Sequence, residues 1–201
     1  MDSAHLLSLT DALRNKKVVV VGDVVVDEFV YGRVARVSRE APVLILEYDS
    51  TEIVPGGAGN AANNVAALGG KATLVSVIGR DVPGRRVVAA LHRRVDSRYV
   101  SRIQGVSTPV KTRILAGGIH SAKQQVVRID RGVAQTVETG ARQKFERAAL
   151  EAIQQADAVL VSDYGSGLIT PAFVGAIRRT LKRTRRQDGL PIPVLIDTRY
   201  R

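Results

Sequence analysis

The chain has 201 residues, of which 45% are hydrophobic and 24% are charged. This composition is typical of a folded globular protein and excludes a disordered or collagen-like chain. The 30 Lys and Arg residues outnumber the 19 Asp and Glu residues, which gives a formal net charge of +11. The absence of cysteine excludes a disulfide scaffold and a thiolate metal site, and three scattered histidines predict no metal centre.

The N-terminus and the apolar runs indicate a protein that is neither exported nor embedded in a membrane. The longest β-branched runs, Val18–Val21 and Val24–Val26, are too short to span a bilayer. The first fifteen residues lack the basic and then apolar layout of a signal peptide. We therefore expect a soluble, cytoplasmic protein with no membrane partner.

The N-terminal half predicts alternating helices and strands. Uninterrupted β-branched runs are typical of buried parallel strands, whereas the Ala-rich segment that ends at Gly69-Gly70 is typical of a helix. The expected elements are a helix over 6–13, strands over Val18–Val21, Phe29–Gly32 and Val43–Tyr48, a helix over Asn60–Leu68, a strand over Ala72–Ile78 and a helix over Pro83–Val95.

The C-terminal half continues the alternation after a predicted β-hairpin. Thr170 suits a helix cap and Pro171 suits a first helical turn. The expected elements are hairpin strands over Val110–Leu115 and Gln125–Asp130, a helix over Glu138–Gln155, a strand over Ala158–Val161, a helix from Pro171 to about Arg185 and a strand over Val194–Ile196. This order predicts an α/β fold: a doubly wound, mostly parallel sheet with helices on both faces and inserted strand pairs.

Three carboxylates follow predicted strands. Asp23 and Asp27 come after the first strand, and Asp163 lies in a Gly-rich loop after a later one. Ligands of open α/β sheets bind beyond the carboxyl ends of strands, so these carboxylates are placed to accept hydrogen bonds from sugar hydroxyls. The competing interpretation is that they are ordinary turn residues.

A Gly-rich segment precedes the Ala-rich helix. Gly56 and Gly57 would let the backbone approach a ligand closely, and Asn60 adds polar groups on the first turn. The segment could equally be a flexible connection. It matches neither the dinucleotide fingerprint nor the phosphate-loop pattern.

Cationic side chains occur in two places. Lys111, Arg113 and Arg128 lie on the predicted hairpin, where they could hold a phosphate or be solvated. Six of the nine residues in Arg178–Arg186 are cationic, but no aromatic residue interrupts the run. We interpret it as a solvated helix face and regard nucleic-acid binding as the weaker alternative.

Five motifs follow one another in order over about 17–201. They are Val21-Gly22-Asp23-x3-Asp27, Arg36–Val43, Pro55-Gly56-Gly57-Ala58-x-Asn60, Val161-Ser162-Asp163-Tyr164 and Leu195-Ile196-Asp197. Together these motifs resemble those of the ribokinase-like (PfkB) carbohydrate kinases. Gln124-Gln125-x-x-Arg128-x-Asp130 and the Ser-Arg-Glu-Ala-Pro-Val segment favour the branch of heptose 7-phosphate kinases, which are often fused to ADP-heptose synthase.

The resemblance implies one carbohydrate kinase domain over 1–201, with lid strands at about 28–49 and 109–131 inserted in the core. It implies a sugar or sugar-phosphate substrate, phosphoryl transfer from Mg-ATP and a homodimer formed through the lid. Asp163 would line the site. The residues that match the family's sugar-binding positions are Asp23, Asp27, Gly56, Gly57 and Asn60, with Lys111 and Arg113 at lid positions that could meet a substrate phosphate.

The chain departs from the family pattern at three points. It lacks the Gly-Ala-Gly-Asp element that supplies the base and the anion hole, so no catalytic residue is assigned and the base is expected beyond Arg201. Ser166 stands where the heptose kinases usually have Lys, and Thr198-Arg199 replaces Pro-Lys. We therefore expect an incomplete domain, inactive alone. The alternative is a degenerate sugar-binding or regulatory module.

Overall fold

The computed structural model describes residues 2–117, 122–132, 137–184, 186 and 189–198. Gly118, Arg185 and Arg199, which belong to segments considered above, lie outside this range. The described elements are α1 (Ser3–Ala12), β1 (Lys17–Gly22), β2 (Val24–Val37), β3 (Leu44–Gly57), α2 (Ala58–Ala67), β4 (Lys71–Gly79), α3 (Val82–Ala89), β5 (Val95–Asp96), β6 (Val100–Ile103), β7 (Val110–Gly117), β8 (Gln124–Arg131), α4 (Thr139–Ala152), the 3₁₀ turn η1 (Ile153–Gln155), β9 (Ala158–Asp163), α5 (Pro171–Arg183) and β10 (Val194–Thr198).

The central sheet is parallel. Its strand order is β10-β9-β1-β4-β5, and β6 also pairs with β4. Each of these pairings runs parallel. Parallel neighbours need crossover connections, so α2, α4 and α5 link strands of this sheet. The predicted doubly wound α/β fold is confirmed.

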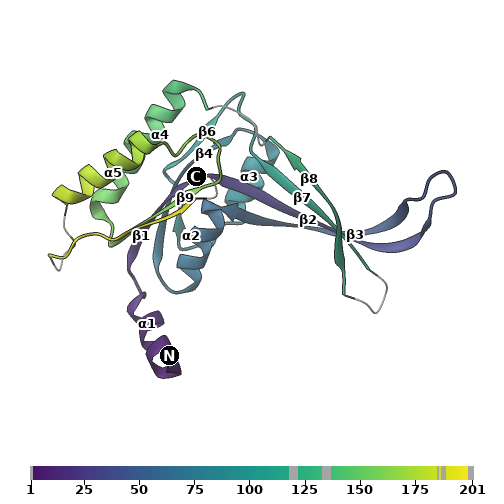
Figure 1. Cartoon of the computed structure of the whole chain (residues 1–201), viewed down its shortest axis with the longest axis horizontal. Helices are drawn as coiled ribbons and strands as arrows, with labels where there is room; N and C mark the ends of the chain where they lie inside the picture. The colour runs from purple at the N-terminus through teal and green to yellow at the C-terminus, as the bar shows by residue number, and fades with distance from the viewer. Residues whose placement is uncertain (1, 118–121, 133–136, 185, 187–188, 199–201) are drawn as a thin grey trace.

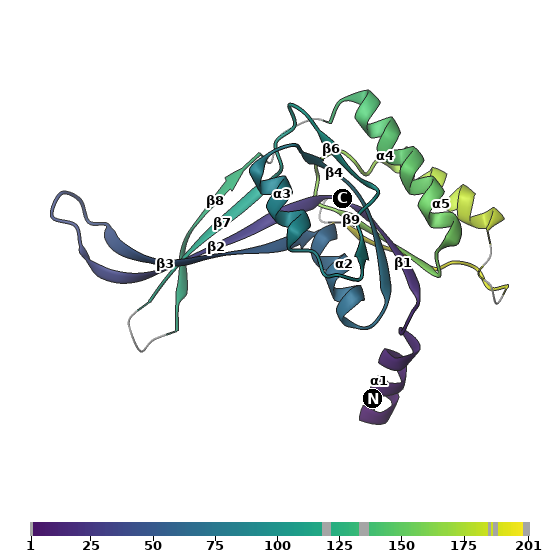
Figure 2. The same ribbon diagram turned by 180° about the vertical axis from the view of Figure 1, so that it is seen from behind.

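Alternating side chains of β1 build two cores, one on each face of the central sheet. Val19 and Val21 point to one face, where they belong to a cluster with Phe145 of α4 and Phe173 of α5. Val20 points to the other, toward the buried residues of α2 and α3. Figures 1 and 2 show the two helix pairs on opposite sides of the sheet. A strand buried on both faces needs apolar residues throughout, which explains the valine run.

A second sheet projects sideways from the central one (Figure 1). Its order is β3-β2-β7-β8, with β2 antiparallel to β3, β2 parallel to β7, and β7 antiparallel to β8. The predicted strand pairs lie here but are longer than expected. Pro55–Gly57, expected as a loop, continue β3 because the buried valines Val24–Val26 pair with them.

The segment after β4 differs from its prediction. The expected helix over Pro83–Val95 ends at Ala89, and Val95 begins β5, where it pairs with Ala72 of β4. Two short strands, β5 and β6, were not predicted because their two and four residues carry too little periodicity.

Helix α5 begins and packs as predicted. The Thr170 hydroxyl accepts a hydrogen bond from the Phe173 amide, 3.2 Å away, and Pro171 occupies the first turn. Ile177 and Leu181 are buried, whereas the described cationic residues of its last two turns, Arg178, Arg179, Lys182 and Arg183, are exposed. This exposure agrees with the solvated-face interpretation. Within the described part of the chain, no helix is both long and apolar enough to cross a bilayer.

We expect Asp81→Ala to lower the free energy of unfolding at neutral pH by about 1–2 kcal/mol, as lost helix caps do. Asp81 caps α3 by accepting from the Gly84 amide (2.8 Å) and also accepts from the Thr108 amide (2.7 Å) and hydroxyl (2.7 Å). Urea unfolding measures the loss, with exposed Asp11→Ala as control. A loss no larger than that of the control would contradict this role.

The same carboxylate should make part of the stability pH-dependent. Burial tends to raise the pKa of Asp81, but the hydrogen bonds from Thr108 and Gly84 outweigh it, so the pKa is lowered. The contribution is therefore present above the ordinary Asp pKa and is lost as the pH falls toward the lowered one.

Candidate functional site

Asp23 joins three segments at the carboxyl end of the central sheet. Its amide donates to the Ser162 carbonyl at the end of β9 (3.0 Å), and its carbonyl accepts from the Ala58 amide at the start of α2 (2.8 Å). Asp23 itself connects β1 to β2. Asp23 and Asp163 therefore lie at the same edge of the central sheet, because β1 and β9 are parallel neighbours.

The Asp23 side chain is buried, with 4% of its surface exposed, and holds the loop after β9. Its Oδ2 accepts from the amides of Tyr164 (2.7 Å) and Ser166 (3.3 Å). Its Oδ1 accepts from the Ser166 hydroxyl. Three donors from residues 164–166 thus converge on one carboxylate, which leaves it far less open to a ligand than a free turn Asp would be.

Burial raises the pKa of Asp23 above its ordinary value. The hydrogen bonds from Ser166 and Tyr164 oppose this shift, while the nearby charge of Asp163 adds to it. The native state therefore holds a proton on Asp23 more tightly than the unfolded chain does. The contribution of this group to stability is full below the ordinary Asp pKa and is lost as the pH rises through the raised pKa.

Gly57 is required by a close approach of the backbone, and Gly56 leaves room for the side chain of Asp27. A Cβ at Gly56 would overlap Oδ2 of Asp27, and a Cβ at Gly57 would overlap the carbonyl oxygen of Asp23. Gly57 also has φ +58°, a left-handed conformation that favours glycine. These two glycines therefore let β3 lie directly against both carboxylate-bearing segments.

Asp27 lies on the second sheet beside cationic side chains. It neighbours Lys111 in register, and Phe29 neighbours Arg113, so all four side chains share one face. Arg113 forms an ion pair through Nη1 with Oδ1 of Asp27, and its guanidinium carbon lies 5.2 Å from the centre of the Phe29 ring. Arg128 is directly opposite Arg113 on β8, which places a further cation on the same face.

Lys111 connects this face to the central sheet. Its Nζ lies 5.8 Å from the ring centre of Tyr164, the residue whose amide is bound by Asp23. The second sheet and the loop after β9 therefore meet through a cation–aromatic contact. This contact brings Lys111, Arg113 and Asp27 to the edge where Asp23 and Asp163 lie.

Two further predicted site residues lie on β9 and on α2. Asp163 is half-buried, accepts from the Gly165 amide (3.0 Å) and from the Thr198 hydroxyl of β10 (3.0 Å), and so ties β9 to β10. Asn60 is exposed on the first turn of α2. A small cavity of about 40 Å³ lies beside Asp23 and Ser166 and is lined mainly by apolar residues.

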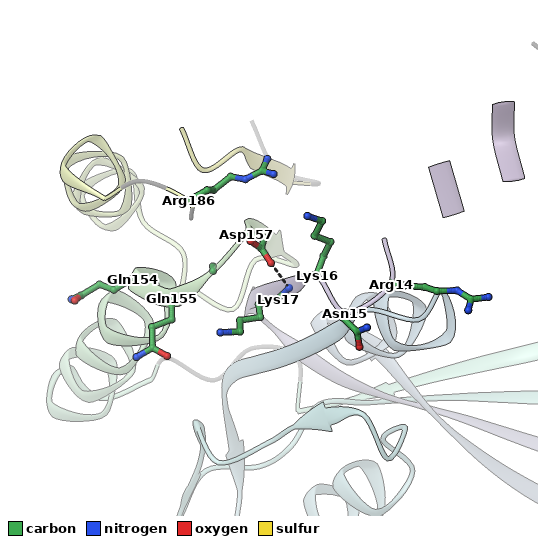
Figure 3. A pocket seen from close by; sticks show the side chains of 9 residues that line it. Arg14, Asn15, Lys16, Lys17, Gln154, Gln155, Asp157 and Arg186 are labelled. Carbon is green, nitrogen blue, oxygen red and sulfur yellow. Dashed lines mark hydrogen bonds between the residues drawn. The ribbon is translucent and has the colours of Figure 1, made fainter. Parts of the chain in front are cut away.

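A larger hollow of about 510 Å³ lies at the opposite end of the central sheet, where β1 and β9 begin (Figure 3). It carries Arg14, Lys16 and Lys17, and Asp157 there accepts from the Lys17 amide (2.8 Å). Figure 3 shows the side chains of Arg14 and Gln154 directed away from each other. Because these groups do not converge and the strands do not end there, we place the candidate site at the Asp23 edge.

The sequence alone indicated no role for Phe29, it placed Tyr164 only within a motif, and it singled out Ser166 only as a departure from the family pattern. Phe29 could have been found from its spacing, because it lies two residues after Asp27 in a strand and so shares its face. The contacts of Tyr164 and Ser166 join segments 141 and 143 residues apart, so no local pattern predicts them.

We expect Ser166→Ala to destabilise the fold by roughly 1.5–3 kcal/mol at pH 8, since it removes a donor to a buried carboxylate. The loss of unfolding free energy should be smaller at pH 4, because a protonated Asp23 needs this donor less. Ser166→Thr, which keeps a hydroxyl, should retain most of the stability. Urea unfolding at pH 4 and pH 8 measures the loss.

Ser76→Ala is the matched control. Ser76 is also buried, but its hydroxyl donates to the neutral Gly22 carbonyl (2.7 Å), so its loss should not depend on pH. Equal losses for Ser166→Ala at pH 4 and pH 8 would show that Ser166 does not act on the Asp23 charge.

Solved structures share this fold at low sequence identity. Phosphofructokinase-2 from Escherichia coli, in complex with fructose-6-phosphate, superposes with a TM-score of 0.60 at 14% identity, covering 92% of this chain and 55% of that chain. Arabidopsis thaliana ribokinase, complexed with ribose and ATP, gives a TM-score of 0.56 at 18% identity, covering 92% of this chain and 53% of that chain. These similarities establish the ribokinase-like fold.

Curated sequence relatives share a higher sequence identity with this chain than these solved structures do. The chain is 37% identical over 198 residues to the bifunctional protein HldE of Trichlorobacter lovleyi, which covers 98% of this chain and 38% of the relative. It is 36% identical over 200 residues to the HldE protein of Koribacter versatilis, covering 97% and 39%. It thus spans about two-fifths of these relatives. The family model of pfkB carbohydrate kinases matches residues 15–201, and the chain therefore belongs to the pfkB family of carbohydrate kinases.

Proposed function

We propose that the chain forms the sugar-binding part of an ATP-dependent carbohydrate kinase whose substrate is a heptose 7-phosphate or a related sugar phosphate. One observation carries the proposal: Asp27, Lys111 and Arg113 share one face of the second sheet, where Lys111 contacts Tyr164 at the carboxyl edge of the central sheet. A carboxylate accepts hydrogen bonds from hydroxyls, and cations bind phosphate. The similarity to HldE proteins supports the heptose branch.

The other residues take supporting roles in this proposal. Gly56 and Gly57 let β3 pack against the segments that carry Asp27 and Asp23. Asn60 contributes an exposed amide, and Asp163 borders the site. For Asp23 we propose a positioning role, because its carboxylate oxygens already accept three hydrogen bonds from residues 164–166.

ATP and Mg²⁺ enter the proposal through the family alone. Among the described residues, no three His, Asp or Glu side chains are grouped as a metal site. The sequence contains no Gly-Ala-Gly-Asp element. We therefore propose that this chain binds the sugar without phosphorylating it. Phosphorylation of heptose 7-phosphate by the purified chain would contradict this.

We expect the chain to bind D-glycero-D-manno-heptose 7-phosphate and Lys111→Met to weaken that binding by about 10- to 100-fold, the range for a lost charged contact. Isothermal titration calorimetry measures the affinity. The exposed Lys144 of α4 provides a charge-matched control, Lys144→Met, which should bind like the parent chain. No binding by the parent chain, or equal weakening by both variants, would refute the proposed site.

We further propose a homodimer through the second sheet. On its face opposite Asp27, the register aligns Val30, Ile114 and Val127, with Ile129 two residues further along β8. Val127 and Ile129 are 45% and 48% exposed. A row of apolar side chains on an exposed sheet face favours association with a like surface.

Ile129→Glu should therefore shift the chain from dimer to monomer, because a charge would be buried in the interface. Light scattering coupled to size exclusion measures the mass, and Val82→Glu, at an equally exposed valine of α3, is the control. A parent chain that is monomeric at high micromolar concentration would contradict the dimer.

A further inference from the structure

Arg113 and Asp27, which the proposed function assigns to different parts of the substrate, bind each other. Nη1 of Arg113 donates to Oδ1 of Asp27, and the two side chains are 22% and 23% exposed. Oδ2 of Asp27 lies against the Cα of Gly56, and the guanidinium of Arg113 lies over the Phe29 ring. The ion pair is therefore enclosed on several sides.

This arrangement means that the hydroxyl-accepting carboxylate is already occupied. A neutral sugar would have to displace a guanidinium from Asp27 with hydroxyl groups alone, which donate hydrogen bonds but bring no positive charge to a carboxylate that is largely shielded from water. A phosphate group changes the balance, because it offers Arg113 an anion of matching geometry in exchange for the carboxylate.

We propose that Arg113 makes the site selective for phosphorylated sugars by occupying Asp27 until a substrate phosphate draws the guanidinium away. The inference rests on the proposed function, in which Asp27 binds a sugar hydroxyl. Phosphate recognition and hydroxyl recognition are then coupled: each favours the arrangement in which the ion pair has opened.

Substitution of Arg128 distinguishes the proposed role of Arg113 from a general effect of positive charge on phosphate binding. It lies opposite Arg113 on the same face of the second sheet, but its Nε pairs with Asp130 at 2.9 Å. Arg128→Met therefore removes a cation from the phosphate side and leaves the pair between Arg113 and Asp27 intact. Arg113→Met removes the cation and frees Asp27, while its unbranched stem can still lie on Phe29.

The test compares D-glycero-D-manno-heptose 7-phosphate with the same heptose without phosphate, by calorimetry on the full chain. The parent chain should prefer the phosphorylated sugar by about 100-fold or more, a preference that needs two charged contacts. Arg113→Met should weaken binding of the phosphorylated heptose about 10- to 100-fold and strengthen binding of the unphosphorylated heptose several-fold. Arg128→Met should weaken binding of the phosphorylated heptose without strengthening that of the unphosphorylated one.

Inorganic phosphate provides a second readout. It should strengthen binding of the unphosphorylated heptose to the parent chain and not to Arg113→Met, because only the parent has an ion pair to open. If Arg113→Met does not fold, Arg113→Lys replaces it, because lysine keeps the charge but lacks the planar fork of the guanidinium. Phosphate should then strengthen heptose binding in the parent chain and do so less in Arg113→Lys.

The outcomes separate the two proposals. If the parent chain binds the phosphorylated sugar but Arg113→Met leaves binding of the unphosphorylated sugar unchanged or weaker, and phosphate has no effect on that binding, the selectivity role is overturned and the proposed function stands. If the parent chain binds neither sugar, both fail.

Discussion

The interaction on which the site depends is the set of hydrogen bonds around Asp23. Its backbone joins the end of β9 to the start of α2, and its carboxylate gathers the amides of Tyr164 and Ser166. Burying a carboxylate is costly unless donors surround it, so the loop after β9 is fixed by the need to satisfy this charge. The edge of the central sheet thereby becomes a defined surface.

The second sheet is attached to that surface by few but specific contacts. Val24 and Val26, at the start of β2, are buried in the core that also contains residues of α2. This end of the second sheet is therefore fixed to the central sheet. Further out, Lys111 of β7 lies over Tyr164 in the loop after β9, while the pair between Arg113 and Asp27 joins β7 to β2 within the second sheet. The cations that we assign to a substrate phosphate thus already have partners within the protein, Lys111 at Tyr164 and Arg113 at Asp27.

Much of the fold could be predicted from the sequence because its signals are local. The valine run of β1 and the Thr170-Pro171 start of α5 reflect burial and capping within a few residues. The length of β3 and the end of α3 could not be predicted from the sequence, because pairing with distant strands determines both. Likewise, sequence placed Asp23 at the correct edge, but the partners of its side chain lie some 140 residues away.

A crystal structure of the chain with D-glycero-D-manno-heptose 7-phosphate would test the proposed sugar site most directly. We predict a sugar hydroxyl on Asp27, the phosphate on Lys111 and Arg113, and Asp23 still bound to Ser166. A ligand bound at the hollow around Lys16 and Lys17, with the pair between Asp27 and Arg113 intact, would contradict it.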